Sequence, residues 1–453
     1  MEPKIQIPLS RQRFSTEDLL RLIIPTVIEQ FLVLLVGLVD TLMITYAGEA
    51  AASGVSLVDQ MNNVFILSFT ALASGGAVVS SQYIGSKDRK NGTLAASQLV
   101  MLTCTISVVV TMILLLWGDG IFRTLFGGVE EDVQAAGLTY LRIMACSLPF
   151  LALYNSCAGL FRSMGRVKIL MYISIVMNTI NVLGNAVGLF VLQAGVAGVA
   201  YPSLISRIFA AVALLWLSLD RRLPVCVQMG QIFHWEKAMS GRILRIAVPG
   251  GIENGLFQMA KVALSSIVTL FGTMQIAAYG VAMSFWSMAG LFCNSMGPVF
   301  TTVIGQYMGS GDIEGAEYYN RKLLRIANWG SGMWNLIFFI LTPAILRWCD
   351  LPQETTRMVL WIVVLHNFFN ALLCPSAFAF PNGLRAAGDA AFTMFASVIS
   401  TVVMRLALSI LFGVIWKMGI VGITIAMICD WALKAALIFW RYRSGKWKDI
   451  RVI

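Results

Sequence analysis

The sequence predicts an all-α polytopic membrane protein, with twelve transmembrane helices in two pseudo-symmetric six-helix bundles. Three observations support this prediction: the composition, the number of long apolar runs and an internal repeat. Of the 453 residues, 58% are hydrophobic and 12% are charged, and the mean hydropathy is +0.78. Soluble domains carry about 25% charged residues. A chain this apolar is expected to fold within a lipid bilayer.

Long apolar runs follow one another along the whole chain. A helix needs about 20 apolar residues to cross the roughly 30 Å of hydrocarbon in a bilayer. Twelve runs meet this requirement, and helices are therefore expected at 22–47, 54–84, 94–117, 136–160, 167–192, 195–218, 243–271, 275–307, 323–346, 356–381, 390–416 and 418–440.

An internal repeat divides these helices into two sets of six. At an offset of 224 residues, Pro25 matches Pro249 and Glu29 matches Glu253, and Arg162 matches Arg385 at an offset of 223. Because six is an even number, both copies enter the membrane from the same side. The halves are therefore expected to be related by an axis along the membrane normal, with a substrate site at their interface.

The repeat gives four expected regions. Residues 1–218 form the first six-helix lobe, 219–242 a cytoplasmic linker, 243–441 the second lobe and 442–453 a basic cytoplasmic tail. The linker is too short to form a domain, and it is expected to let the two bundles rock against each other.

Similar loops, QYIGSKDRKNG and QYMGSGDIEGA, follow the second and eighth predicted helices. They fit a cytoplasmic latch or hinge, but turn and cap chemistry is the favoured interpretation. Gly85 and Gly309 are expected to end their helices in the left-handed conformation. Asp88 and Asp312 are expected to cap the helices that follow.

The basic residues predict the orientation. Placing both termini in the cytoplasm puts 24 lysines and arginines inside and leaves only Arg123, Arg347, Arg357 and Lys417 outside. The expected location is the cytoplasmic (inner) membrane. The net charge of +10 is then explained by contact with anionic lipid, so membrane lipid is an expected partner and nucleic acid is not. The first 18 residues contain no short apolar segment with a cleavage site, so no signal peptide is expected.

No motif indicates an enzyme, a bound cofactor or a metal site. Nucleotide-binding, hydrolase and zinc-protease motifs are absent, and the two histidines, His234 and His366, lie far apart. The scattered cysteines are interpreted as packing residues and not as a disulfide framework. They lie at 104, 146, 157, 226, 293, 349, 374 and 429.

The first predicted helix contains two acids, Glu29 and Asp40. An ionised carboxylate in hydrocarbon costs roughly 3 kcal/mol, so such acids usually face a polar cavity and serve a function. Eleven residues are about three helical turns, which places both acids on one face about 16 Å apart. Asp40 is the favoured ion-coupling group. For Glu29 and its counterpart Glu253, coupling and an architectural role remain equally open.

Helix 167–192 places Asn178, Asn181 and Asn185 on one face. They fit interhelical hydrogen-bonding or a polar wall that donates to the carboxylate of Asp40, and both roles are compatible.

Charged residues also interrupt the second half. Asp430 and Lys434 have i, i+4 spacing and are expected to neutralise each other. Arg207 and Lys434 are expected to extend towards the cytoplasm. Lys261 and Arg405 each need an anion, and Glu253 is a candidate. Glu29, Glu253, Lys261 and Arg405 therefore form a candidate second polar site.

Aromatic residues crowd the seventh and eighth predicted helices. They are usually lipid-facing or core residues, but in a cleft they would suit a flat hydrophobic cation. The candidate substrate-cleft residues are Phe257, Tyr279, Phe285 and Trp286.

Five motifs stand out along the chain: P25-x14-V39-D40-T41, Q82-Y-x-G85, R162-S-M-G165, N181-V-L-G-N185 and G195-V-A-G-V-A. Together they resemble multidrug and toxic compound extrusion (MATE) transporters of the prokaryotic type. The resemblance covers nearly the whole chain and implies two six-helix lobes that exchange organic, often cationic, compounds for protons or sodium. It also implies that Asp40 binds the coupling ion, with Tyr140, Asn181 and Ser203 around it.

Two positions depart from the family pattern. Asn185 replaces an acid that many members carry, and Phe257 occupies the position of a coupling glutamate, with Glu253 one turn earlier. Because sodium prefers several anionic oxygens, the missing acid favours protons.

The expected function is secondary efflux of small amphipathic organic cations by a monomer, by alternating access. Alternatives are a flippase for a lipid-linked precursor and a non-transporting membrane scaffold or receptor.

Overall fold

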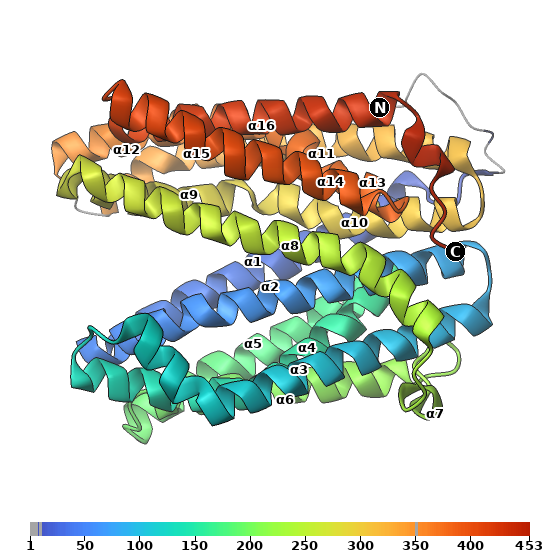
Figure 1. Ribbon diagram of the computed structural model, residues 1–453, viewed down its shortest axis with the longest axis horizontal. Helices are drawn as coiled ribbons and strands as arrows, with labels where there is room; N and C mark the ends of the chain where they lie inside the picture. Colours follow the sequence, from blue (N-terminus) through green and yellow to red (C-terminus); the bar gives the residue numbers. More distant parts are fainter. Residues whose placement is uncertain (1–7, 9–10, 349–351) are drawn as a thin grey trace. The chain divides into compact units, whose positions relative to one another are not determined.

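The computed structural model describes residue 8, residues 11–348 and residues 352–453, and Cys349 lies outside this part of the chain. The described chain contains twelve helical spans that are long and apolar enough to cross a membrane. This confirms the predicted number, and Figure 1 labels the helices in chain order. The chain divides into two compact units. We call Leu20–Val248 the N-terminal unit, and Pro249–Ile453 together with the described part of Met1–Leu19 the C-terminal unit.

The N-terminal unit is built around α4, which packs against α2, α3 and α6. Its core includes the fully buried side chains of Val58, Phe122 and Leu141. Gly188 meets the backbone of Gly198 so closely that a Cβ on either glycine would clash, which explains how α5 and α6 approach each other. The helices are α1 (Thr16–Thr45), α2 (Glu49–Gly85), α3 (Arg89–Phe126), α4 (Glu131–Ser163), α5 (Val167–Ala186) with a π-helical end at Val187–Val191, α6 (Ala197–Ser218) and α7 (Met229–Ile232).

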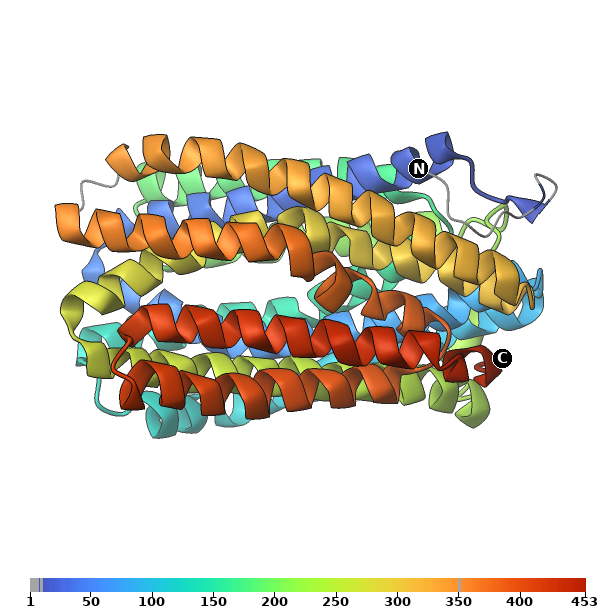
Figure 2. The ribbon, with the colours of Figure 1, turned by 90° about the horizontal axis from the view of Figure 1, so that it is seen from above.

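The C-terminal unit has the same order of spans but more interruptions. Its fifth span, Ala390–Ile415, runs beside α16 in both views (Figures 1 and 2). Its helices begin with the part of α8 (Lys237–Val268) that follows Val248. The others are α9 (Thr273–Ala289), α10 (Leu291–Gly309), α11 (Ile313–Trp348), α12 (Gln353–Cys374), α13 (Pro381–Ala386), α14 (Ala390–Ser397), α15 (Arg405–Leu408) and α16 (Gly419–Arg443), with π-helical turns at Pro375–Ala379, Val398–Met404 and Ser409–Ile415.

The backbone repeats as the sequence does. Of the eleven described residues with positive φ, ten form pairs at offsets of 224 or 223 residues, and Gly445 stands alone. Residues other than glycine rarely adopt this conformation, so its recurrence is strong support for duplication. The pairs are Gly48 and Gly272, Lys87 and Gly311, Gly165 and Gly388, Gln193 and Lys417, and Gly195 and Gly419.

The repeated loops differ from the prediction in one respect. The left-handed residues are Lys87 and Gly311, whereas Gly85 and Gly309 are the last residues of α2 and α10. That prediction was wrong because Gly85 and Gly309 still have the helical conformation, and the left-handed residue follows two positions later. The predicted caps are present. A carboxylate oxygen of Asp88 accepts a hydrogen bond from the backbone N–H of Asn91 (3.1 Å), and Asp312 does the same for Gly315 (2.9 Å).

The segment expected to link the lobes packs onto the N-terminal unit, which extends to Val248 and not to residue 218. Gln98 of α3 holds this segment at four points. Its amide nitrogen donates to the carbonyls of Gln231 and His234, and its amide oxygen accepts from the Glu236 N–H and the Ser240 hydroxyl. The segment is therefore a docked arm and not a free linker.

Residues before α1 form a corresponding arm on the C-terminal unit. The Tyr307 hydroxyl donates to the carbonyl of Arg11 (3.0 Å) and accepts from the N–H of Arg13 (2.7 Å). The ring of Phe14 packs against Tyr307 and Tyr319. In the N-terminal unit, Arg242 of the other arm donates to Tyr83. Tyr83 and Tyr307 are repeat counterparts, so each arm contacts the tyrosine at the same position of its repeat.

The seven described cysteines are free thiols, of which Cys157, Cys226, Cys293 and Cys374 are buried and Cys146 is exposed.

Candidate functional site

Each unit contains an ion pair between its first and fourth spans. In the N-terminal unit Arg162 Nη2 donates to Glu29 Oε1 at 2.6 Å, and the Glu29 side chain is only 2% exposed. Arg162 lies in the last turn of α4, just before the left-handed Gly165. The pair therefore ties the end of α4 to α1.

The C-terminal unit repeats this pair and adds to it. Arg385 Nη2 donates to Glu253 Oε2, and the Ser397 hydroxyl donates to Glu253 Oε1 at 2.6 Å. Lys434 Nζ also lies 3.5 Å from Glu253 Oε1. Glu253 thus has two cationic partners, Arg385 and Lys434, whereas the cationic partner of Glu29 is Arg162.

Asp40 lies in the N-terminal unit on α1 and faces α5. Asn185 Nδ2 donates to Asp40 Oδ1 at 2.7 Å. The Asn185 side chain is fully buried, and its amide also lies 3.4 Å from Asn181 Oδ1. Asn181 donates to the Ser203 hydroxyl at 2.9 Å. Asp40 therefore ends a chain of hydrogen bonds that runs through Asn185 and Asn181 to Ser203 on α6.

A second acid, Asp59 of α2, belongs to the same site and was not predicted. The buried Tyr140 hydroxyl donates to Asp59 Oδ1 at 3.3 Å, and no hydrogen bond joins Tyr140 to Asp40. Asp59 is close enough to Asp40 to act on it electrostatically. Asp59 also interrupts the predicted apolar run 54–84, and that interruption was the available signal in the sequence.

Arg207 supplies a positive charge to this cluster. Its Nη1 donates to the Ser147 hydroxyl at 2.6 Å, and its charge acts on both Asp40 and Asp59. The expectation that Arg207 extends towards the cytoplasm is therefore wrong, because this guanidinium is engaged by polar groups within the unit. With both acids ionised, Asp40, Asp59 and Arg207 carry a net charge of −1.

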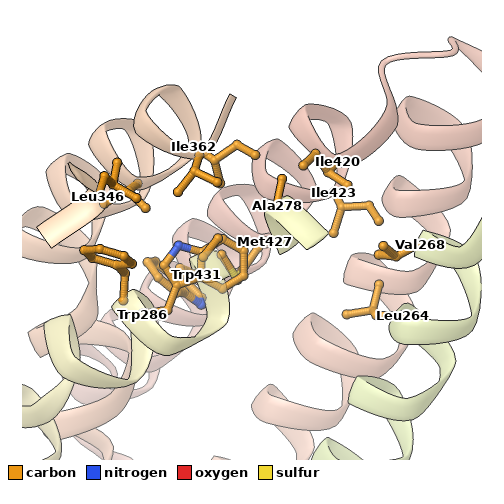
Figure 3. Packing of buried hydrophobic residues seen from close by; sticks show 14 of the residues in the cluster. Leu264, Val268, Ala278, Trp286, Leu346, Ile362, Ile420, Ile423, Met427 and Trp431 are labelled. Atoms are coloured by element: carbon orange, nitrogen blue, oxygen red, sulfur yellow. The ribbon is translucent and has the colours of Figure 1, made fainter. Parts of the chain in front are cut away.

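The C-terminal unit contains a cavity of about 390 Å³. Three of the four aromatic residues predicted for a cleft, Phe257, Tyr279 and Trp286, line it. Phe285 instead packs in the adjoining apolar cluster. Figure 3 shows that cluster, with Leu264, Trp286, Met427 and Trp431 among its labelled residues.

The cavity wall also contains a stack of rings. Trp286 stacks on His366 with centroids 4.7 Å apart and meets Tyr279 edge-on at 5.8 Å. His366 meets Trp431 edge-on at 5.1 Å. Flat surfaces of this kind suit an aromatic ligand.

The buried charges pair differently from the prediction. Arg405 Nε and Nη2 both donate to Asp430 Oδ2, at 2.9 and 2.6 Å. Lys434 pairs with Glu253 and lies 4.5 Å from the centroid of the Phe378 ring. The predicted pairing of Asp430 with Lys434, and the predicted extension of Lys434 towards the cytoplasm, are therefore wrong. A buried acid gains more from the arginine's two donors than from a neighbouring lysine.

Of the four residues predicted for a second polar site, Glu253, Lys261 and Arg405 all line this cavity. Glu29 instead lies in the N-terminal unit with Arg162. Lys261 forms no ion pair with Glu253 or with any other described acid within 4.0 Å.

The two sites occupy corresponding places in the repeat. At the offset of 224, Asp40, Asp59 and Arg207 match Leu264, Met283 and Trp431, and all three of those residues line the cavity of the C-terminal unit. At these three positions one repeat therefore has two acids and an arginine, where the other has apolar side chains of the cavity wall.

Within the described residues, no group of three or more histidine, cysteine or acidic side chains is arranged to hold a metal ion.

Comparison with known proteins agrees with this architecture. The chain is 25% identical over 452 residues to the uncharacterized transporter YisQ of Bacillus subtilis, covering 97% of this chain and 96% of that one. It is 23% identical to the probable multidrug resistance protein NorM of Thermotoga maritima, covering 100% and 96%. A crystal structure of MATE in complex with MaL6 matches with a TM-score of 0.87 at 18% identity, covering 96% and 97%. The family model MatE matches residues 25–187 and again residues 249–411, at the same offset of 224. This multi-pass membrane protein therefore belongs to the MatE family.

Proposed function

We propose that this protein exports small amphipathic organic compounds across the cell membrane by alternating access, in exchange for an ion that binds at Asp40. The proposal rests on one observation above the others. Asp40 lies in a transmembrane helix, is hydrogen-bonded by the fully buried Asn185, and has a second acid and an arginine nearby. Intramembrane carboxylates with such partners are typical of coupling sites in transporters.

We propose the proton as the coupling ion. Asp59 provides a second carboxylate besides Asp40, but Arg207 places a fixed positive charge beside both acids. A sodium ion prefers several anionic oxygens, and Arg207 reduces the net charge of the two ionised acids to −1. Protonation instead removes negative charge from a carboxylate without adding an ion to the site.

The proposed orientation has both termini in the cytoplasm, and the protein acts as a transporter and not as an enzyme. Organic cations are the substrate class implied by the family resemblance, and the net negative cluster in the N-terminal unit is compatible with them. Relatives named as probable multidrug resistance proteins also support efflux of drug-like compounds.

Ethidium efflux from cells expressing the protein tests this proposal. Asp40→Asn keeps the size and polarity of the side chain but removes its titration, so efflux is expected to fall at least tenfold. Asp132→Asn is the matched control, because Asp132 is an exposed acid of the same unit in the first turn of α4. Equal ethidium accumulation in cells with wild type and Asp40→Asn would contradict the proposal and favour a scaffold or receptor.

A further inference from the structure

The charge balance of the cavity in the C-terminal unit is opposite to that of the cluster at Asp40. Glu253 is the only acid among the described residues that line the cavity, whereas Lys261, Arg405 and Lys434 are all in its wall. Asp430 and Arg385 stand behind this wall as partners of Arg405 and Glu253. These six residues carry two negative and four positive charges. The cavity therefore has an excess of two positive charges.

Lys261 is the cation without a counter-ion. Arg405 is satisfied by Asp430, and Lys434 and Arg385 share Glu253. Lys261 is half-buried and forms no ion pair within the described chain, and the charged neighbour whose field acts on it is another cation, Arg405. A half-buried ammonium group without an anion is costly, so an anionic ligand would be stabilised here.

The rest of the wall suits the apolar part of such a ligand. Phe257, Tyr279 and Trp286 line the cavity with Lys261. The volume of about 390 Å³ lies within the range of about 300–1,000 Å³ for small-molecule sites. Trp286 and Trp431 each have an indole N–H without a hydrogen-bond partner in the described chain, and Asn370 has one such acceptor. The unpaired polar groups of the wall are therefore mostly donors.

We infer that this cavity binds an amphipathic organic carboxylate, with its carboxylate on Lys261 and its aromatic part against Phe257, Tyr279 and Trp286. The inference rests on the proposed function and deepens it by adding a substrate class, organic anions, to the expected cations. The duplication explains how one fold holds both sites. Lys261 matches Gly37 of the first repeat, and Lys434 matches Ala210, so these positive charges belong to the second repeat alone.

The test compares three ligands of the same shape by calorimetry on the full-length protein in lipid nanodiscs, with empty nanodiscs as the blank. The ligands are 2-naphthoate, the neutral 2-naphthamide and the cationic 2-naphthylmethylammonium. A charge-assisted contact with Lys261 predicts that naphthoate binds roughly tenfold or more tightly than naphthamide. The ammonium compound is expected to bind most weakly.

Variants of Lys261 test whether its charge causes the preference for naphthoate. Lys261→Met keeps the length of the side chain without its charge and is expected to lower the affinity for naphthoate to that for naphthamide. Unchanged naphthamide binding by this variant shows that the cavity is intact. Lys261→Arg is expected to retain the preference for naphthoate, as is the control Lys446→Met, since Lys446 is exposed elsewhere in the same unit. A preference for the ammonium compound, or a naphthoate preference that survives Lys261→Met, overturns the inference.

The calorimetry tests the carboxylate site independently of coupling at Asp40, because ligand binding needs no ion gradient. If naphthoate is not preferred while Asp40→Asn abolishes ethidium efflux, the inference fails and the proposed coupling stands. If naphthoate is preferred while Asp40→Asn leaves efflux unchanged, the carboxylate site stands and the coupling at Asp40 fails.

Discussion

The two repeats share one ion pair and differ in almost every other intramembrane charge. Glu29 with Arg162 and Glu253 with Arg385 join the same two spans in each unit. The N-terminal unit alone then carries Asp40 and Asp59, where the other repeat has Leu264 and Met283. The C-terminal unit adds Lys261, Arg405, Asp430 and Lys434. Duplication thus preserved the pair that holds the helices together, while the charges around the two polar sites diverged.

This comparison separates architecture from function. A pair present in both repeats is explained by the fold that they share, and its loss is expected to affect stability. A charge present in one repeat is not required by that fold, and its loss is expected to affect binding or transport unless it is buried with a partner.

The largest stability effect is expected at Arg405 and Asp430, which are 5% and 0% exposed. Arg405→Met leaves Asp430 as an uncompensated buried charge and is expected to cost about 3–5 kcal/mol. Thermal unfolding of the purified protein measures this loss. The double variant Arg405→Met with Asp430→Leu removes both charges and is expected to recover most of the stability. A double variant no more stable than Arg405→Met would show that the pair itself is required.

A smaller effect is expected at the shared pair, and it should differ between the units. Glu253→Gln leaves Arg385 and Lys434 together without their acid, whereas Glu29→Gln removes the counter-ion of Arg162. Each change is expected to destabilise the protein by about 3 kcal/mol, and Glu253→Gln is expected to have the larger effect. Melting temperatures of the two variants measure the difference. Normal stability combined with lost efflux in Glu29→Gln would instead assign this acid to coupling.

The smallest effect is expected at the repeated helix caps. Asp88→Ala and Asp312→Ala each remove a hydrogen bond to a backbone N–H at the start of a helix, and each is expected to cost about 1 kcal/mol. The similarity of the two losses is the informative result, because both residues perform the same role. A loss at one cap alone would mean that the loops have diverged.

The cap at Asp88 also has a pH dependence. Hydrogen bonds from the Asn91 side chain and backbone hold the pKa of Asp88 below its ordinary value. Its contribution to stability is therefore fully present above the unfolded pKa of about 3.9 and is lost as the pH falls through the lower folded value. The free energies of unfolding of wild type and Asp88→Ala are expected to converge at low pH.

Hydropathy and the repeat predicted the number of helices and the match between halves, because helix length and repeat offset are properties of the chain itself. The exact helix ends were less predictable. The left-handed residue of the first repeated loop is Lys87 and not Gly85, because α2 keeps the helical conformation through the glycine that is the usual signal for a helix end.

The pairing of buried charges could not be derived from spacing. Asp430 has a lysine one turn away on its own helix but binds Arg405, 25 residues earlier. That choice depends on which faces of two helices meet, and hydropathy does not contain this information. Asp59 was overlooked for a related reason. A single acid in an apolar run becomes significant only when Tyr140 and Arg207 from other helices are placed beside it.

Transport by purified protein in proteoliposomes, with pH and sodium gradients imposed separately, tests proton coupling at Asp40 most directly. A pH gradient without sodium is expected to drive ethidium transport by wild type and by Asp132→Asn but not by Asp40→Asn. A sodium gradient, with the same pH on both sides of the membrane, is expected to drive no ethidium transport. Transport driven by sodium at fixed pH, or transport by Asp40→Asn equal to that of wild type under the pH gradient, would contradict the assignment of the coupling proton to Asp40.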